Sequence, residues 1–295
     1  MIGVVATAQR RGPEALQAML AGWLQNYDSR HTRAAYRSDL EHFRRWSIAE
    51  RVDPFDLDAA DVQRYRAACE ASGARPSTVA RRLSAIASFA AFALQHGYSL
   101  GAPRVDRPVV PVPSSTGSLS DDDATAILAA ADNMNPRSAL LVRLLVLDGL
   151  KIGEAVEANA ADVSGRPPHM TLTLQGAITR DVQLHAETAA SIAAYLGKRR
   201  RGPLLLSEHR ARLSERLTRF GVDYVIKQAA EIAGISGPVS GNTLRRRFVA
   251  AAYERGEDLD DIRQNAGHAD VRTTRRYLPD TQRTDVQHHH RQPRT

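Results

Sequence analysis

Residues 240–280 contain the group of side chains best suited to chemistry. Arg245 lies at the edge of an apolar helical face. A Gly267-His268 pair ends the next expected helix, and Tyr277 comes nine residues after the histidine. The planar fork of an arginine matches phosphate oxygens, histidine can assist proton transfer, and a tyrosine oxygen can act as a nucleophile. Residues of these types at this spacing suit chemistry at a phosphate group.

Each of these residues also has an ordinary structural explanation. A histidine at a helix end, such as His268, is usually structural, and a tyrosine near a C-terminus is usually packed. The arginine run that begins at Arg245 could be a solvated face. A lone Cys69 on a helical segment is typical of a small packed residue. The joint pattern, rather than any single residue, therefore carries the functional interpretation.

The composition favours a partner that carries many negative charges. The 295-residue chain has a formal net charge of +7 and a pI of about 9.9, and basic proteins gain affinity for polyanions by releasing condensed counterions. Its one cysteine excludes an internal disulfide and fits a reducing cytoplasm. No stretch of about 18 apolar residues is present, so no membrane-spanning helix is expected. Any role that needs a lysine has three candidates, Lys151, Lys198 and Lys227.

The first hundred residues show helical periodicity and almost no strand signal. Apolar residues recur at three- and four-residue spacing over 16–24, and a second apolar face follows from Tyr36 to Trp46. Helix boundaries are expected at residues typical of helix ends, namely Thr32 and Asp61 as N-caps, Pro76 in a first turn and Gly97 as a C-terminal glycine.

The second half of the chain mixes helices with one small sheet. Ser120, followed by three aspartates, is a strong helix start. Met170, Leu172 and Leu174 alternate with threonines, which predicts a β-hairpin with its turn around Gly176. Further helices are expected up to Tyr277.

These patterns predict a mainly α protein of two domains. Residues 102–119 are rich in proline, glycine, serine and threonine, as an extended linker would be. The last residues are polar, and three consecutive histidines there cannot all face one ion on a regular helix, so neither a metal site nor a cofactor is expected. The predicted parts are an all-helical domain over 1–101, the linker over 102–119, a mainly helical domain with a small antiparallel sheet over 120–282, and a disordered basic tail over 283–295.

Several motifs together resemble those of the tyrosine recombinase (phage integrase) family. That family has a box His-x-Leu-Arg-His-Thr-Phe, then Leu-Gly-His, then Thr-Thr-x-x-Tyr. This sequence has Asn-Thr-Leu-Arg-Arg-Arg-Phe, Ala-Gly-His and Thr-Thr-Arg-Arg-Tyr in the same order. Upstream, LLVLDGLKIGEAVEANAADV is similar to the segment with the family's first arginine. TRAAYRSDLEHFRRW and RPSTVARRLSAIASFAAFALQHG resemble its SAM-like, DNA-clamping N-domain, so the resemblance covers roughly residues 10–280.

The resemblance implies a chemistry in which Tyr277 attacks a DNA phosphodiester and forms a 3′-phosphotyrosine. The bond energy is retained, so neither ATP nor metal is needed. By position, Arg245 is the second arginine that grips the non-bridging oxygens, and His268 is the histidine of the Gly-His pair. A lysine on the hairpin would protonate the leaving 5′ oxygen.

Three site positions depart from the family pattern. Lys151 stands where the first arginine belongs, which keeps the charge and loses the bidentate fork. Asn242 replaces the histidine of the box, and Gln175 falls at the hairpin-lysine position. Glu154, by contrast, matches an acidic residue expected to orient its neighbours. The departures make retained strand cleavage an open question.

The implied partner is double-stranded DNA, clamped between the two domains. We expect the protein to be a monomer in solution and a homotetramer on DNA, in the cytoplasm with the nucleoid, and not at a membrane. The residues expected to contact DNA are Arg33, Arg37, Arg81, Arg82, Arg180, Arg246, Arg247 and Arg275.

Two other functional classes remain open at this point. One is a recombinase-fold DNA-binding protein that has lost cleavage and acts as an accessory, regulatory or architectural factor. The other is a helical scaffold with no role on DNA, which requires that the basic residues be scattered over the surface.

Overall fold

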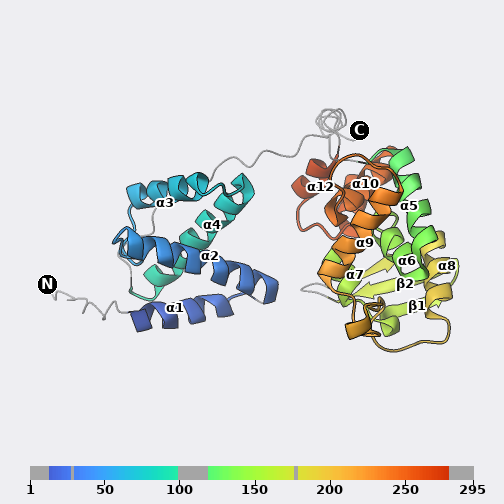
Figure 1. Cartoon of the computed structure of the whole chain (residues 1–295), viewed down its shortest axis with the longest axis horizontal. Coiled ribbons are helices and arrows are strands. Elements are labelled where there is room, and N and C mark those ends of the chain that lie inside the picture. Colours follow the sequence, from blue (N-terminus) through green and yellow to red (C-terminus); the bar gives the residue numbers. More distant parts are fainter. Residues whose placement is uncertain (1–12, 28–29, 99–118, 176–178, 279–295) are drawn as a thin grey trace, which may run out of the picture. The chain divides into compact units, whose positions relative to one another are not determined.

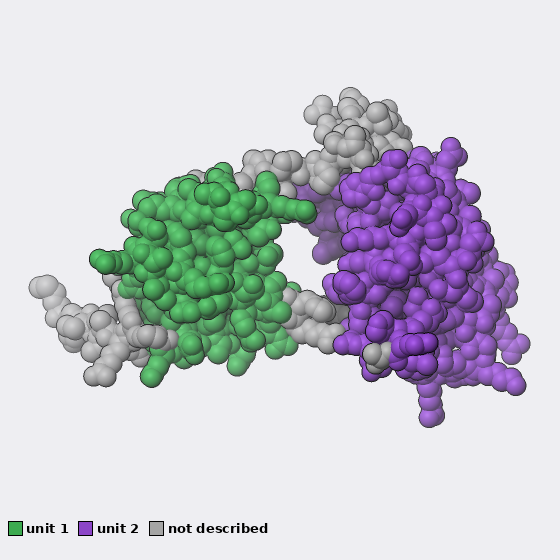
Figure 2. Space-filling model, in the orientation of Figure 1, with its two compact units in different colours: residues 1–111 green, residues 112–295 purple. Residues whose placement is uncertain are grey.

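The structure, a computed structural model, is mainly α-helical with one small sheet, as predicted (Figure 1). It describes residues 13–27, 30–98, 119–175 and 179–278. Two compact units divide the chain at 111/112 (Figure 2). The predicted linker 102–119, apart from Leu119, and the predicted tail 283–295 lie outside the described residues.

Unit 1 is built from helices only in its described residues. They are α1 (Pro13–Gln25), α2 (Arg30–Ala49), α3 (Ala59–Ala71) and α4 (Pro76–Gln95). Pro76 occupies the first turn of α4, where its missing N–H costs no hydrogen bond. Gly97 follows the C-cap with a positive φ of 74°, so both predictions about the ends of this helix are confirmed.

Two of the predicted N-caps are wrong. α3 is capped by Asp58, whose carboxylate accepts a hydrogen bond from the backbone N–H of Asp61 at 2.7 Å. The carboxylate of Asp61, the third residue of α3, in turn accepts a hydrogen bond from the Asp58 N–H, which completes a capping box. α2 begins at Arg30, which places Thr32 inside the first turn. In both helices the predicted cap is the third residue of the helix, so the helix starts earlier than its sequence predicts.

The core of unit 1 is aromatic. Trp23 of α1 stacks on Tyr36 of α2 with ring centroids 5.2 Å apart, and its indole N–H donates to Ser88 Oγ on α4 at 3.1 Å. The buried Phe89 of α4 lies 5.9 Å from Trp23, and the buried Tyr65 of α3 packs edge-on against Phe43 of α2 at 5.1 Å, centroid to centroid. These contacts join all four helices, because each contributes a large ring or its hydrogen-bond partner.

Unit 2 packs its helices around the buried helix α6, with the sheet along one side (Figure 1). Ser120 caps α5 through a capping box with Asp123, as its sequence predicted. The helices are α5 (Asp121–Met134), α6 (Pro136–Val146), α7 (Ile152–Glu157), α8 (Ala186–Leu196), α9 (Arg219–Ile232), α10 (Gly241–Glu254), α11 (Leu259–Asn265) and α12 (Val271–Tyr277), with short 3-10 turns η2 (Ala160–Asp162) and η3 (Arg210–Arg212).

The sheet has three antiparallel strands in the order β1-β2-β3. The predicted hairpin is confirmed as β2 (His169–Leu174) and β3 (Arg180–Gln183), with Leu172 opposite Val182, although its turn lies outside the described residues. The inward side chains of β2 are buried, as the alternation predicted. The edge strand β1 (Val163–Arg166) was not predicted, because its four residues include one apolar side chain and no alternation.

A buried carboxylate connects α6 to α8. Asp148 accepts hydrogen bonds from the His185 N–H at 2.7 Å and from Thr188 Oγ1 at 2.6 Å. Burial is the main cause that raises the pKa of Asp148, to about 7, while the two hydrogen bonds oppose it. The folded protein therefore favours the protonated carboxyl.

We expect Asp148→Asn to remove a pH dependence of stability. Because the folded pKa is raised, the stabilisation is fully present below the unfolded value of 3.8 and is lost as the pH rises through about 7. An asparagine does not ionise, so the variant does not lose this stabilisation. The free energy of unfolding of Asp148→Asn, relative to that of the wild type, should therefore increase by roughly 1–3 kcal/mol from pH 4.5 to pH 8. Urea unfolding at both pH values measures this, with Asp122→Asn at an exposed site of α5 as the control. Parallel pH curves for Asp148→Asn and wild type would contradict it.

None of the helices in the described part of the chain is long and apolar enough to cross a membrane.

Candidate functional site

Four segments of unit 2 bring the predicted site residues together. They are the turn after α6, helix α10, the residues that follow α11, and helix α12, and α10 packs against α6, α11 and α12. A small apolar cluster around Phe248, Ile262 and Leu278 holds α10, α11 and the end of α12 in place. The cluster is local to this end of the unit, where α10 and α12 lie together in Figure 1.

Arg245 is buried at the centre of the site. It is 3% exposed, and its guanidinium donates to the carbonyl oxygens of Gly149 and Ala266. These bonds join the turn after α6 to the end of α11 and fix the plane of the fork. Burial lowers the pKa of Arg245, while the Glu154 carboxylate and the Tyr277 side chain oppose this shift. The Tyr277 hydroxyl therefore lies within electrostatic reach of this guanidinium.

Gly149 is required where Arg245 finds its first acceptor. Its φ is +62°, a conformation that side chains other than glycine rarely adopt. A Cβ there would lie 2.2 Å from Cδ1 of Phe248. The turn can therefore pass this close to α10 only with glycine at this position.

Tyr277 lies at the end of α12 with its ring half-buried and its hydroxyl held. The hydroxyl donates to Oδ1 of the exposed Asn242 on α10 at 2.6 Å. The His268 ring is 4.9 Å away, centroid to centroid, and the Arg246 guanidinium carbon is 5.5 Å from the tyrosine ring centroid. Asn242, at the box-histidine position, thus orients the hydroxyl but cannot titrate.

His268 is buried and neutral at pH 7. Burial, together with the positive charges of Arg245, Lys151 and Arg180, lowers its pKa to about 4. Its Nδ1 lies 2.9 Å from Thr274 Oγ1. Its Nε2 is buried and has no hydrogen-bond partner among the described residues.

Lys151 and Arg180 share one carboxylate. Glu154 accepts from Arg180 at 3.0 Å and lies 3.5 Å from Lys151 Nζ. Lys151 Nζ also donates to the Gly267 carbonyl at 2.8 Å, and Arg180 donates to the Asn265 carbonyl at 2.6 Å. The two cations therefore converge on the segment between α11 and His268, and the Lys151 side chain remains 49% exposed.

Two predicted residues make their hydrogen bonds or ion pairs with residues outside this cluster. Gln175 follows β2 and is exposed, and its amide oxygen accepts a hydrogen bond from Thr179 at 3.4 Å. Arg247 is on a different face of α10, where it is 8% exposed and pairs with Asp121 and Glu254. The ion pair with Asp121 gives Arg247 a structural role, because it joins α10 to α5.

The remaining arginines predicted to contact DNA differ in exposure. Arg33 and Arg37 lie one helical turn apart on the exposed face of α2. Arg81 and Arg82 of α4 both lie near the buried Asp39, which Arg81 contacts directly. Arg275, on α12 next to the cluster, is half-buried, and so is Arg246.

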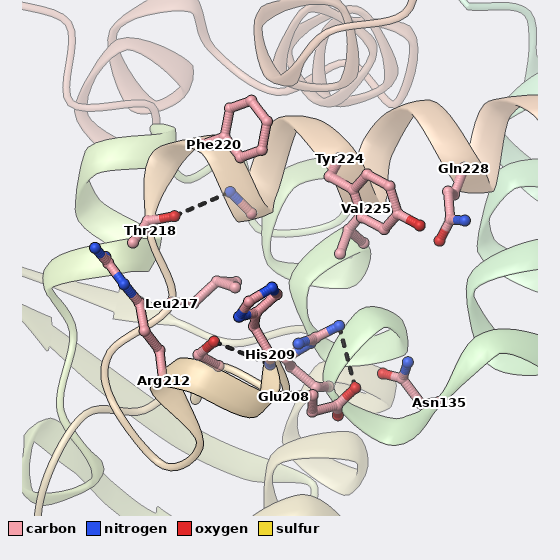
Figure 3. A pocket seen from close by; sticks show the side chains of 13 residues that line it. Asn135, Glu208, His209, Arg212, Leu217, Thr218, Phe220, Tyr224, Val225 and Gln228 are labelled. Atoms are coloured by element: carbon pink, nitrogen blue, oxygen red, sulfur yellow. Dashed lines mark hydrogen bonds and ion pairs between the residues drawn. The ribbon is translucent and has the colours of Figure 1, made fainter.

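The structure also has an open pocket that the sequence did not reveal. It holds about 930 Å³ between the start of α9 and the segment 207–212 (Figure 3). Phe220 of α9 is 82% exposed at this pocket, and an Arg137–Glu208 pair of 3.3 Å lies on the opposite wall. It shares no lining residue with the cluster around Tyr277.

A metal is not implied by the described side chains, among which no group of three or more His, Cys, Asp or Glu could hold an ion. The histidines 288–290 lie outside the described residues. The chemistry available at the cluster is that of a phenol beside a neutral imidazole, two arginines and a lysine, a set that can bind and polarise a phosphodiester.

Known proteins resemble both units of the chain. The profile of the phage integrase family matches residues 118–283, and that of the phage integrase N-terminal SAM-like domain matches residues 23–97. Tyrosine recombinase XerD of Caulobacter vibrioides is 30% identical over 84% of this chain and 86% of its own length. Tyrosine recombinase XerC of Rhodospirillum centenum is 31% identical over 94% of this chain and 85% of its own.

Solved structures share the fold. A lambda integrase (75–356) dimer bound to a COC′ core site superposes with a TM-score of 0.66 at 16% identity, covering 87% of this chain and 96% of that one. XerH recombinase in a post-cleavage complex with a palindromic difH substrate gives 0.63 at 17% identity, covering 79% and 69%. Together with the two profiles and the XerD and XerC relatives, these matches show that the chain belongs to the phage integrase family of tyrosine recombinases.

Proposed function

We propose that this protein is a site-specific DNA recombinase that cleaves and rejoins strands through a 3′-phosphotyrosine at Tyr277. One observation carries the proposal: the Tyr277 hydroxyl is held at 2.6 Å by Asn242 beside His268 and within reach of the buried Arg245. The Tyr277 side chain is partly exposed and lies beside the Arg246 guanidinium, as suits a nucleophile that must meet a phosphate.

The residues of the cluster divide the work of the transfer. Tyr277 Oη gives up its proton to solvent as it attacks the phosphorus, its P–O bond forms as the bond to the 5′ oxygen breaks, and the 5′ oxygen takes up a proton from solvent as it leaves. Arg245 faces the charge that develops on the non-bridging oxygens, with Arg180 and Lys151 nearby. Rejoining reverses these steps, so the energy of the phosphodiester is conserved and no ATP is consumed.

Lys151 is the one lysine of the described site, where it can act on the phosphate that Tyr277 attacks. It stands at the first-arginine position and its side chain is half exposed. Its positive charge is one of the causes that lower the pKa of His268. We propose that it supplies positive charge to the bound phosphate in place of the missing arginine. Glu154 and the Gly267 carbonyl orient the amine and leave part of it open to a ligand.

Lys151→Gln is expected to slow DNA cleavage by about 10²-fold, because a charged donor to the phosphate is lost. DNA affinity at moderate salt should change by much less. Lys198→Gln, which removes the same charge from an exposed site after α8, is the matched control. Rates of adduct formation under single-turnover conditions measure both. Equal rates for Lys151→Gln and Lys198→Gln would remove Lys151 from the reaction.

We further propose that double-stranded DNA is the partner, that exposed arginines such as Arg33 and Arg37 contact its backbone, and that a homotetramer assembles from monomers on paired sites. A lambda integrase tetramer bound to a Holliday junction is among the structures of like fold. Such a protein would act in the cytoplasm with the nucleoid. The rival, a DNA-binding factor without cleavage, has less support, because the relatives that cover most of the chain are tyrosine recombinases.

Covalent trapping tests the proposal. Purified protein is incubated with fragmented DNA of its own replicon that carries random nicks. Where a nick lies close to the cleavage site, the short fragment with the free 5′ hydroxyl diffuses away, so rejoining is blocked. We expect adducts that survive denaturation and whose DNA ends map to one short sequence. DNA binding with a steep salt dependence and no adduct at any sequence would replace the recombinase with the non-cleaving rival.

A further inference from the structure

The hydrogen bond between His268 and Thr274 has a consequence for what His268 can offer to a ligand. The two side chains meet at 2.9 Å through Nδ1 and Oγ1, and both are buried. A neutral imidazole carries one N–H, so one ring nitrogen donates and the other accepts. Which nitrogen faces the site as a donor is therefore decided by the direction of this one bond.

The surroundings of the threonine decide the direction. Thr274 lies within α12 and is fully buried, and His268 Nδ1 is the one hydrogen-bond partner of its hydroxyl among the described residues. A buried hydroxyl proton without an acceptor costs more than an oxygen with an unused lone pair. The hydroxyl therefore donates to Nδ1.

We propose that Thr274 is a positioning residue that fixes His268 as the Nε2–H tautomer and directs this N–H at the reacting phosphate. Nε2 is the ring atom that has no partner among the described residues, and the ring lies 4.9 Å from that of Tyr277. The charged groups that act on the imidazole are Arg245, Lys151 and Arg180, so the ring keeps to one proton. An acceptor oxygen brought by a phosphate completes the hydrogen bonding of the buried imidazole.

The backbone around the pair supports a fixed ring. The His268 N–H donates to the Arg263 carbonyl at 2.9 Å, and Gly267 precedes it with a φ of +60°. A Cβ at Gly267 would lie 2.6 Å from Nε of Arg180. The main chain of His268 is thus held by α11, and its side chain is held by α12 through Thr274.

The tautomer can be measured on the full chain without DNA. Long-range proton–nitrogen NMR spectra of histidine-labelled protein at pH 7 distinguish the two tautomers, and His268→Gln assigns the signals. We expect His268 as Nε2–H, with an Nδ1 resonance displaced by an accepted hydrogen bond. An Nδ1–H imidazole at His268 in the wild type would overturn the proposal.

Variants of Thr274 then separate the hydrogen bond from the shape of the side chain. Thr274→Val keeps the shape and loses the donor, so the Nδ1 displacement should disappear and cleavage should fall about 10- to 100-fold, as when the partner of a functional histidine is removed. Thr274→Ser should restore both. Wild-type Nδ1 resonance and cleavage in Thr274→Val would overturn the proposal. Should Thr274→Val not fold, the tautomer of the wild type decides.

The cleavage comparison rests on the proposed function, whereas the NMR measurement does not. A wild-type protein that forms no DNA adduct would refute cleavage at Tyr277, and the tautomer of His268 in the free protein would still decide the role of Thr274.

Discussion

Tyr277→Phe is expected to abolish the covalent DNA adduct, with a loss of roughly 10⁴-fold or more, as for the removal of other covalent nucleophiles. Phenylalanine keeps the ring that packs between His268 and Arg246. It loses the oxygen that forms the bond and the hydrogen bond to Asn242. Stability should therefore change little, and sequence-specific DNA affinity should be retained. Adduct formation on the trapped sequence, measured on denaturing gels, checks this.

Tyr253→Phe is the matched control for this variant. Tyr253 is on α10, is also partly buried, and packs against the same apolar cluster as Tyr277. Its hydroxyl is not part of the site, so the variant should form the adduct at the wild-type rate. Persistence of the adduct in Tyr277→Phe would show that another side chain is the nucleophile.

Arg245→Lys is expected to lower the rate of cleavage by about 10²- to 10³-fold, the size of the effect when one donor to a developing oxyanion is lost. A lysine keeps the charge, but it cannot donate to the Gly149 and Ala266 carbonyls and still present a donor to a phosphate in a fixed plane. An ammonium has three donors but no planar fork, so it would bond the two buried carbonyls less well than the guanidinium does. We therefore also expect the free energy of unfolding to fall by about 1–3 kcal/mol.

Single-turnover cleavage and urea unfolding measure the two effects separately. Arg255→Lys, at the exposed C-cap of the same helix, makes the same substitution outside the site and should leave both unchanged. A cleavage rate for Arg245→Lys close to that of Arg255→Lys would show that the guanidinium fork is not needed in the transition state.

The sequence predicted the elements whose signals are local. Ser120 and Pro76 mark helix starts by their own chemistry, and the alternation around Leu172 identifies a strand with one buried face. The edge strand β1 has no such pattern. Its place is set by its pairing with β2, which its own four residues do not reveal. Asp61 cannot be told from the cap by its own residue type, because an aspartate in the first turn of a helix is favoured at the helix start as the cap itself is.

For the site, the motifs predicted which residues belong together but not how they are held. Lys151, Arg245, His268 and Tyr277 lie together, although Lys151 and the Gly267 carbonyl that it contacts are 116 positions apart in the sequence. The structure alone shows that the Gly149 carbonyl anchors Arg245 and that Thr274 bonds His268, because both contacts depend on how neighbouring elements pack. The signal for Thr274 in the sequence is the Thr-Thr pair before Tyr277, which marks the motif but not the hydrogen bond.

The most direct test of the account is to identify the residue that carries the DNA. The trapped adduct is digested with nuclease and protease, and tandem mass spectrometry locates the remaining nucleotide on the peptides. We expect a nucleotide linked through its 3′ phosphate to Tyr277 and to no other residue. A linkage at another tyrosine, at a serine or through a 5′ phosphate would contradict it.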